Sequence, residues 1–153
     1  MKPTLYIFSG LPASGKSTLA KLLAAETKAF YLRIDTIEQA LRELCSFNVR
    51  GEGYRLTYRI AADNLKIGLN VISDSCNPIE LTRDEWDAVA ISNNADYVNI
   101  EVRCSDSVEH QQRIKTRANE VPGLILPDWS EVVNREYHKW NKERIFIDTA
   151  GKS

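Results

Sequence analysis

The stretch TLYIFSGLPASGKST, residues 4–18, decides the fold that the sequence predicts. Its first six residues are mostly apolar, with several β-branched or aromatic side chains, which is typical of a buried strand. The eight residues from Gly10 to Ser17 fit the pattern G-x-x-x-x-G-K-[ST]. Apolar residues then recur at helical spacing as far as Lys28. A strand, a glycine-rich loop and a helix in this order predict a loop that binds phosphate groups.

Each residue type in this loop suits a phosphate ligand. Glycines let the backbone approach the phosphates closely, and consecutive N–H groups at the start of a helix point at the anion. We expect Lys16 to reach the β- and γ-phosphates, and the hydroxyl of Ser17 to bind Mg²⁺. The sequence therefore predicts binding of ATP with Mg²⁺. The predicted nucleotide-binding residues of the loop are Gly10, Pro12, Ala13, Ser14, Gly15, Lys16, Ser17 and Thr18.

The rest of the chain alternates between predicted strands and predicted helices. Further strands are predicted at 30–34, 69–73, 97–103 and 144–148, and further helices at 35–45, 54–67, 82–92, 106–117 and 130–141. This alternation predicts an α/β, three-layer P-loop NTPase fold, with a five-stranded parallel sheet between helices. Ligands of such sheets bind beyond the carboxyl ends of the strands, so the residues that follow each strand are candidates for chemistry.

The composition indicates one domain, residues 1–153, with no strong field. The net charge of −1 gives no general attraction to nucleic acid or to an anionic membrane. Cys45, Cys76 and Cys104 are far apart and form no Cys-x-x-Cys pair, which argues against a disulfide framework and a zinc site. We find neither a signal peptide nor a membrane span in the sequence. We therefore expect a cytoplasmic protein with reduced thiols and no membrane partner.

Two aspartates follow predicted strands at the same edge of the sheet as the phosphate loop. Asp35 could accept the proton of an attacking hydroxyl near the γ-phosphate, which is the interpretation we favour. Alternatively, Asp35 is a helix N-cap, with Glu38 completing a capping box. Asp74 follows an apolar strand and could hold Mg²⁺ directly or through water, or it could cap its own loop.

A pair of arginines precedes a segment rich in proline and glycine. Arg113 and Arg117 are spaced i,i+4 and share one helix face, where a bound triphosphate would offset their repulsion. The alternative is a solvated face on which Glu109 pairs with Arg113. We expect residues from about 113 to 130 to form a lid, because a kinase must exclude the water that competes with the acceptor hydroxyl.

Three other features carry less weight. Residues 148–151 fit the D-x-x-G pattern of GTPases, but they follow the last strand, and no N-K-x-D pattern for binding guanine is present. These two observations argue against a GTPase. Arg55 and Arg59 could bind an anionic acceptor, although a solvated helix face is the favoured interpretation. His110 and His138 are isolated, and we expect them on the surface or behind the site.

Together, these residues resemble the small P-loop kinases related to the kinase domain of phage-type polynucleotide kinase, chloramphenicol phosphotransferase and zeta toxin. The similarity extends from the start of the chain to about Pro127. Many members of this group carry the label AAA family ATPase. The resemblance implies a nucleoside-monophosphate-kinase-like fold with residues 148–151 beside the nucleotide base. It also implies that Asp35 is the general base, that Arg113 stacks on adenine, and that Arg117 stabilises phosphoryl charge from the lid.

One departure from the family bears on the acceptor. Polynucleotide kinases have an arginine three residues past the general base, where this chain has Glu38. We therefore predict a kinase that transfers the γ-phosphoryl group of ATP to an alcohol group of a small molecule or a nucleotide. Lys16, Asp35 and Arg117 are the predicted catalytic residues, and Ser17 and Asp74 are the predicted metal ligands. The alternatives are a polynucleotide 5′-hydroxyl kinase and a nucleotide-binding module with little transferase activity.

Overall fold

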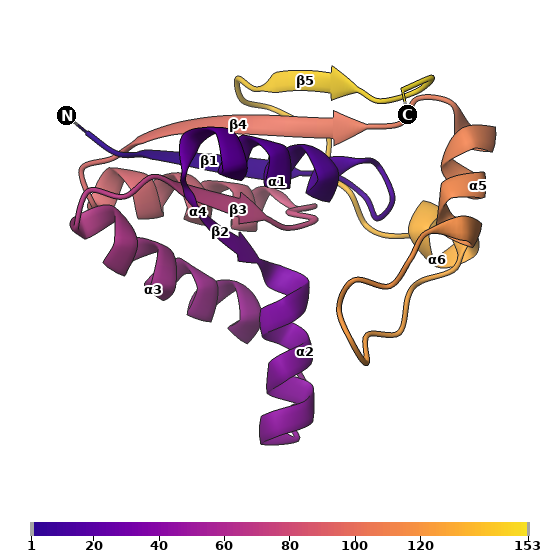
Figure 1. Cartoon of the computed structure of the whole chain (residues 1–153), viewed down its shortest axis with the longest axis horizontal. Helices are drawn as coiled ribbons and strands as arrows, with labels where there is room; N and C mark the ends of the chain where they lie inside the picture. The colour runs from indigo at the N-terminus through magenta and orange to yellow at the C-terminus, as the bar shows by residue number, and fades with distance from the viewer. Residues whose placement is uncertain (1, 153) are drawn as a thin grey trace.

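A computed structural model describes residues 2–152 as an α/β fold around one sheet. The strands are β1 (Thr4–Ser9), β2 (Phe30–Arg33), β3 (Val71–Asp74), β4 (Asp96–Arg103) and β5 (Ile145–Asp148). Their order in the sheet is β2-β3-β1-β4-β5, and every neighbouring pair is parallel (Figure 1). The predicted five-stranded parallel sheet is confirmed.

Helices cover both faces of this sheet. They are α1 (Lys16–Thr27) on one face, and α3 (Glu52–Lys66) and α4 (Glu80–Ser92) on the other (Figure 1). Successive side chains of a strand point to opposite faces, so β1 contributes to both cores. Leu5 and Ile7 pack with Trp86 of α4, whereas Phe8 packs with Ala20 of α1. The three predicted layers therefore have a separate hydrophobic core on each side of the sheet.

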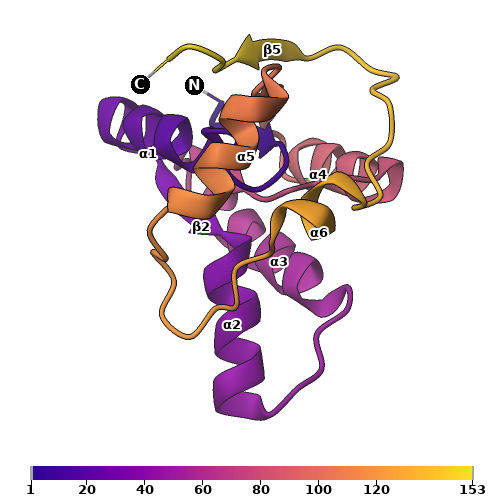
Figure 2. The same ribbon diagram turned by 90° about the vertical axis from the view of Figure 1, so that its right-hand side faces the viewer.

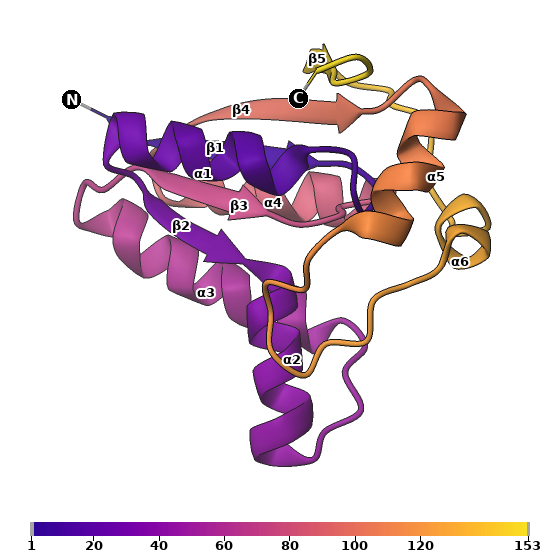
Figure 3. The ribbon, with the colours of Figure 1, turned by 45° about the vertical axis from the view of Figure 1, so that its right-hand side comes forward.

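The remaining helices lie toward the carboxyl ends of the strands. They are α2 (Ile34–Cys45), which extends away from the sheet, α5 (Ser107–Thr116) and α6 (Trp129–Val133). Figure 2 views the molecule from this end, with α5 and α6 in front of the sheet. Residues 117–128 run from α5 past α2 to α6 as an irregular segment (Figure 3). No helix within residues 2–152 is long and apolar enough to span a membrane.

The predicted helix over residues 130–141 is wrong beyond Val133. Its backbone groups are used by other parts of the fold: His138 N donates to Pro78 O at 2.7 Å, and Arg83 Nη1 donates to His138 O at 3.0 Å. The Arg83 guanidinium also stacks on Trp140, 4.1 Å from the ring centroid. Because these contacts take the hydrogen-bonding groups that a helix would pair internally, the chain stays irregular up to β5.

Helix starts were also predicted imperfectly. α4 begins at Glu80, two residues before the predicted start at Thr82. Thr82 therefore lies inside the first turn, where its hydroxyl donates to Ile79 O at 3.2 Å. The N-cap of α5 is Asp106, whose carboxylate accepts hydrogen bonds from two backbone N–H groups of the first turn.

Candidate active site

The loop between β1 and α1 has the conformation that a phosphate cradle requires. A Cβ atom at Gly10 would collide with the carbonyl oxygen of Val102, so only glycine fits there. Ala13 and Gly15 have positive φ angles of 61° and 97°. Gly15 is the N-cap of α1 and has no side chain with which to cap the helix. The N–H groups of the first turn of α1 therefore remain for an anion.

Lys16 and Asp74 meet at the edge of the sheet. Phe8 lies opposite Asp74 in the β1–β3 register, so the end of β3 lies beside the start of the phosphate loop. Lys16 Nζ is 2.5 Å from Asp74 Oδ1. Tyr31 OH also donates to the Asp74 carboxylate. Burial alone would raise the pKa of Asp74, but Lys16 and its other hydrogen-bond donors hold that pKa below its usual value. Asp74 is therefore a buried, ionised carboxylate.

Asp74 and Ser17 fit the place of a magnesium ion. Ser17 lies close enough to Asp74 to contribute to lowering the pKa of that carboxyl, so the two side chains are neighbours. Nucleotide-bound Mg²⁺ is typically held by one or two protein oxygens, while phosphates and water supply the other ligands. Within residues 2–152 there is no group of three or more His, Cys, Asp or Glu side chains that could hold a metal ion.

Asp35 does not cap α2, and the capping-box interpretation is wrong. The helix begins at Ile34, and its N-cap is Arg33, two residues before Asp35. Arg33 lies opposite Asp74 in the β2–β3 register, so Asp35 follows just beyond the same sheet edge. Its side chain is exposed in the first turn of α2, where a negative charge is favourable. The carboxylate is thus not committed to a helix cap and can contact a ligand.

Ionisable groups from separate segments lie near enough to Asp35 of α2 to influence one another. We call Asp35, Glu38, Cys76, Arg117 and Arg135 the acceptor-side cluster. Burial lowers the pKa of Arg117, and the Asp35 charge opposes that change. Burial raises the pKa of Cys76, whereas Arg135 opposes it by its charge and a hydrogen bond. Within the described chain, the buried Nε of Arg117 has no hydrogen-bond partner, as an anionic ligand would provide.

Glu38 is the second acidic residue of this cluster. A Cβ atom at Gly53 would collide with Glu38 Cγ, so the missing side chain lets α3 approach and cover Glu38. This burial, together with the charge of Asp35, raises the pKa of Glu38 to about 7, and the charges of Arg42 and Arg135 oppose the rise. Arg135 belongs to no sequence motif and reaches the cluster through the irregular chain after α6, so sequence reasoning missed it.

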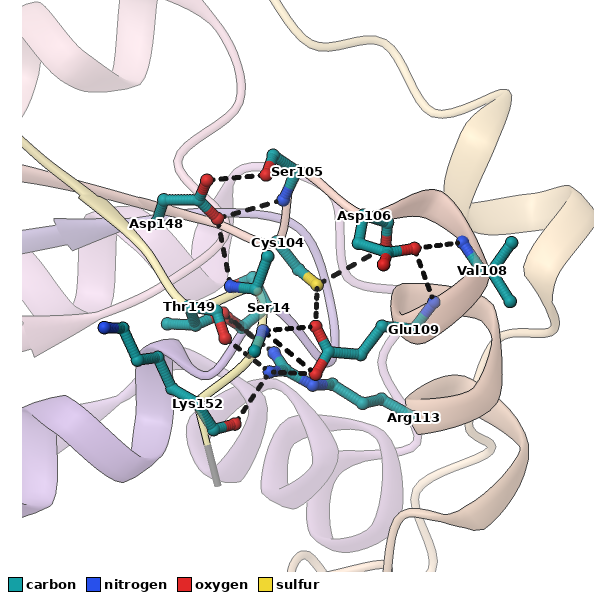
Figure 4. Close-up of polar contacts among 12 residues, drawn as sticks. Ser14, Cys104, Ser105, Asp106, Val108, Glu109, Arg113, Asp148, Thr149 and Lys152 are labelled. Atoms are coloured by element: carbon teal, nitrogen blue, oxygen red, sulfur yellow. Dashed lines mark hydrogen bonds and ion pairs between the residues drawn. The ribbon is translucent and has the colours of Figure 1, made fainter.

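Arg113 links residues 148–151 to the phosphate loop by hydrogen bonds (Figure 4). Its Nη1 donates to Thr149 Oγ1 at 2.8 Å, and its Nη2 donates to Thr149 O at 2.7 Å. Thr149 Oγ1 in turn donates to Ser14 O at 2.6 Å. Residues 148–151 therefore pack against the loop. The guanidinium of Arg113 is hydrogen-bonded to Thr149 of this segment, and its stacking on adenine stays a prediction.

The segment 117–128 is held in place by Glu120, which the sequence did not single out. Its carboxylate lies 2.8 Å from Lys21 Nζ and 2.9 Å from Arg33 Nη2. Arg33 Nε also donates to Tyr31 OH at 3.0 Å, so the segment is linked to a residue that contacts Asp74. These contacts hold the predicted lid over α1 and the end of β2.

Asn77 supports the site from below through hydrogen bonds to three other parts of the fold. Its Nδ2 donates to Ser9 Oγ at 2.8 Å, and its backbone N–H donates to Tyr54 OH at 2.9 Å. The buried Arg83 donates to Asn77 O at 3.0 Å. Next to it, Gly10 N donates to Cys76 O at 3.1 Å, which joins this loop to the phosphate loop.

Comparison with known proteins agrees with this geometry. A family model described as an AAA domain matches residues 5–137, which is most of the chain. The chain belongs to this AAA-domain family. No curated protein matches it.

Solved structures place this AAA-domain protein among P-loop kinases in fold. A protein of Chloroflexus aurantiacus J-10-fl, named as a candidate kinase, has a TM-score of 0.76 at 20% identity, covering 99% of this chain and 90% of that chain. The Mycobacterium tuberculosis APS kinase in complex with AMPPNP and APS has a TM-score of 0.69 at 19% identity, covering 96% and 88%. A Sinorhizobium meliloti 1021 gluconokinase has a TM-score of 0.65 at 13% identity, covering 99% and 84%. The predicted resemblance to small P-loop kinases is confirmed at the level of family and fold.

Proposed function

We propose that this AAA-domain protein is a kinase that transfers the γ-phosphoryl group of ATP to an alcohol group of a small molecule or nucleotide. The observation that carries the proposal is the uncommitted Asp35 carboxylate just beyond the sheet edge where Lys16 meets Asp74. A carboxylate in that position can take the proton of an attacking hydroxyl. A module that only binds nucleotide would not need it.

Each group of site residues has a separate role in the proposed reaction. The backbone N–H groups of the phosphate loop and Lys16 bind the phosphates, and Lys16 exchanges part of its contact with Asp74 for them. Mg²⁺, held by Ser17 and Asp74, would neutralise charge on the β- and γ-phosphates. Arg117, with its buried unpaired Nε, stabilises charge on the phosphoryl group in transfer. Asp35 accepts the proton of the acceptor hydroxyl.

A small acceptor is favoured over a polynucleotide. The acceptor-side cluster has carboxylates as well as guanidiniums, and the net charge of −1 gives no salt-dependent attraction to a phosphate backbone. Two proteins that share the fold, the APS kinase and the gluconokinase, act on small molecules. Cys45, Cys76 and Cys104 are free, which suits the reducing cytoplasm.

The test is ATP consumption with and without a panel of hydroxyl compounds, including sugars, nucleosides and a 5′-hydroxyl oligonucleotide. We expect ADP release to rise with at least one small acceptor and a phosphate monoester to form. Lys16→Ala should abolish both, while Lys115→Ala, an exposed lysine of α5, serves as the matched control. ADP release that no acceptor changes would favour the nucleotide-binding module, and phosphorylation of the oligonucleotide alone would favour the polynucleotide kinase.

A further inference from the structure

Side chains of α5 hold the carbonyl groups of the phosphate loop. His110 Nε2 lies 2.8 Å from Pro12 O, and the imidazole ring is buried, with 6% of its surface exposed. Arg113 Nη1 lies 3.4 Å from Ser14 O. Residues three apart share one face of a helix, so α5 presents both side chains to the loop. His110 was expected on the surface or behind the site, and it lies directly behind the loop.

This contact fixes which way the loop peptides face. A carbonyl oxygen can only accept, so His110 Nε2 must carry the hydrogen. In a planar trans peptide the N–H points opposite to the C=O. Since Pro12 O faces α5, the N–H of Ala13 faces away from α5, and by the same argument so does the N–H of Gly15. If the Pro12–Ala13 peptide rotated, an oxygen would replace an N–H group in the phosphate cradle and would repel the anion.

The same imidazole ring also contacts the far end of the lid. It packs edge-on against Trp129, with ring centroids 5.1 Å apart and planes at 79°. Trp129 is the first residue of α6, immediately after the segment 117–128. Two residues beyond the end of α6 comes Arg135 of the acceptor-side cluster. The side chain of His110 thus contacts both the phosphate loop and α6, the helix that follows the lid.

We propose that His110 is a positioning residue that sets the phosphate loop for nucleotide and couples that loop to the lid. Its hydrogen bond to Pro12 O orients the loop, and its contact with Trp129 passes a change in the loop to α6 and the lid. The inference rests on the proposed nucleotide site. It adds a link between nucleotide binding and the enclosure of the acceptor.

Two substitutions separate the two contacts. His110→Phe keeps an aromatic ring against Trp129 and removes the hydrogen bond, whereas His110→Gln keeps an N–H donor of similar reach and removes the ring. Gln112→Phe, on the exposed side of α5, is the matched control. The probe is ADP with Mg²⁺, with affinity measured by calorimetry and lid closure by amide hydrogen exchange in residues 118–128.

We expect His110→Phe to bind ADP about tenfold more weakly, equivalent to about 1.4 kcal/mol, and His110→Gln to stay within about twofold of wild type. Saturating ADP should slow amide exchange in the lid of wild type and of His110→Phe. In His110→Gln it should leave that exchange unchanged. A merely structural role would impair both variants in both measurements. If His110→Phe does not fold, His110→Leu removes the same hydrogen bond, and Trp129→Leu should lose only the lid response.

Wild-type affinity in His110→Phe, or full lid protection in His110→Gln, would overturn the inference alone. A wild-type chain that binds no ADP would overturn the proposed nucleotide site together with the inference. The two failures are therefore distinguishable by the wild-type titration.

Discussion

Replacing Glu38 with glutamine should stabilise the protein above neutral pH and have a smaller effect in acid. The carboxyl group is covered by α3 at Gly53, and burial together with the Asp35 charge raises the pKa of Glu38 from 4.5 to about 7. Glutamine has nearly the same shape and carries no charge to desolvate. The substitution therefore removes the cost of ionising a buried acid and preserves the packing.

The sign of the pH dependence follows from proton binding. The unfolded chain loses the Glu38 proton near pH 4.5, whereas the folded chain keeps it until about pH 7. Between these values the folded state binds more protons than the unfolded state, so the free energy of unfolding falls as pH rises. A pKa difference of this size corresponds to about 3 kcal/mol if fully expressed. Because the side chain is partly exposed, solvent screening reduces the expected penalty to about 1–2 kcal/mol.

The assay is urea unfolding of wild type and Glu38→Gln at about pH 5 and about pH 8. Glu26→Gln, on the exposed surface of α1, is the control for removing one surface charge. We expect Glu38→Gln to gain clearly more stability at about pH 8 than at about pH 5, and the control to show no such difference. An equal effect at both pH values, or a loss at the higher one, would refute the reasoning. A side chain that costs stability beside a candidate general base is typical of a functional site.

Three further substitutions test other parts of the structure. Glu120→Gln removes the two ion pairs of the lid, which together contribute about 0.5–1.5 kcal/mol for partly exposed pairs, so amide exchange in residues 118–128 should become several-fold faster. Unchanged exchange would mean that other contacts hold the lid. Gly10→Ala places a Cβ atom against the carbonyl oxygen of Val102, so it should reduce the free energy of unfolding by about 1–3 kcal/mol and lower the thermal midpoint. A thermal unfolding curve identical to that of wild type would contradict this packing. Asp106→Ala should cost about 1 kcal/mol in urea unfolding by removing the α5 cap, whereas Asp106→Asn should keep most of it; equal losses in both variants would argue against capping.

Features that depend on neighbouring residues could be predicted from the sequence. The strand from Thr4, the glycine-rich loop and the helix after it follow from local patterning, and the parallel sheet follows from the alternation of strands and helices. The position of Asp74 at the same sheet edge as the phosphate loop was expected, because both follow parallel strands. The Asp106 cap was predictable because its partners lie within the next three residues.

Features that depend on distant contacts could not be predicted. Residues 134–141 have a helical pattern, but Arg83 donates to the carbonyl groups of His138 and Lys139, and this contact exists only once the chain has folded. Glu120 and Arg135 reach the site from irregular segments, whose path no periodicity specifies. His110 gave no motif because its partner is a backbone carbonyl, which any residue at position 12 would supply.

A two-residue error in the N-cap of α2 decided between the two interpretations of Asp35. The sequence left two roles open for Asp35, and the N-cap role depended on where the helix begins. With Arg33 as the N-cap, Asp35 falls in the first turn. The interpretation as a general base is the one that remains to be tested.

The most direct measurement of the central claim is the phosphoryl-transfer rate of Asp35→Asn, once the acceptor panel has given a substrate. Asparagine keeps the size of the side chain and cannot take the proton. We expect ADP affinity within about twofold of wild type and a transfer rate lower by about 10²- to 10⁴-fold, the usual contribution of a positioned general base. Transfer by Asp35→Asn at the wild-type rate would contradict the account.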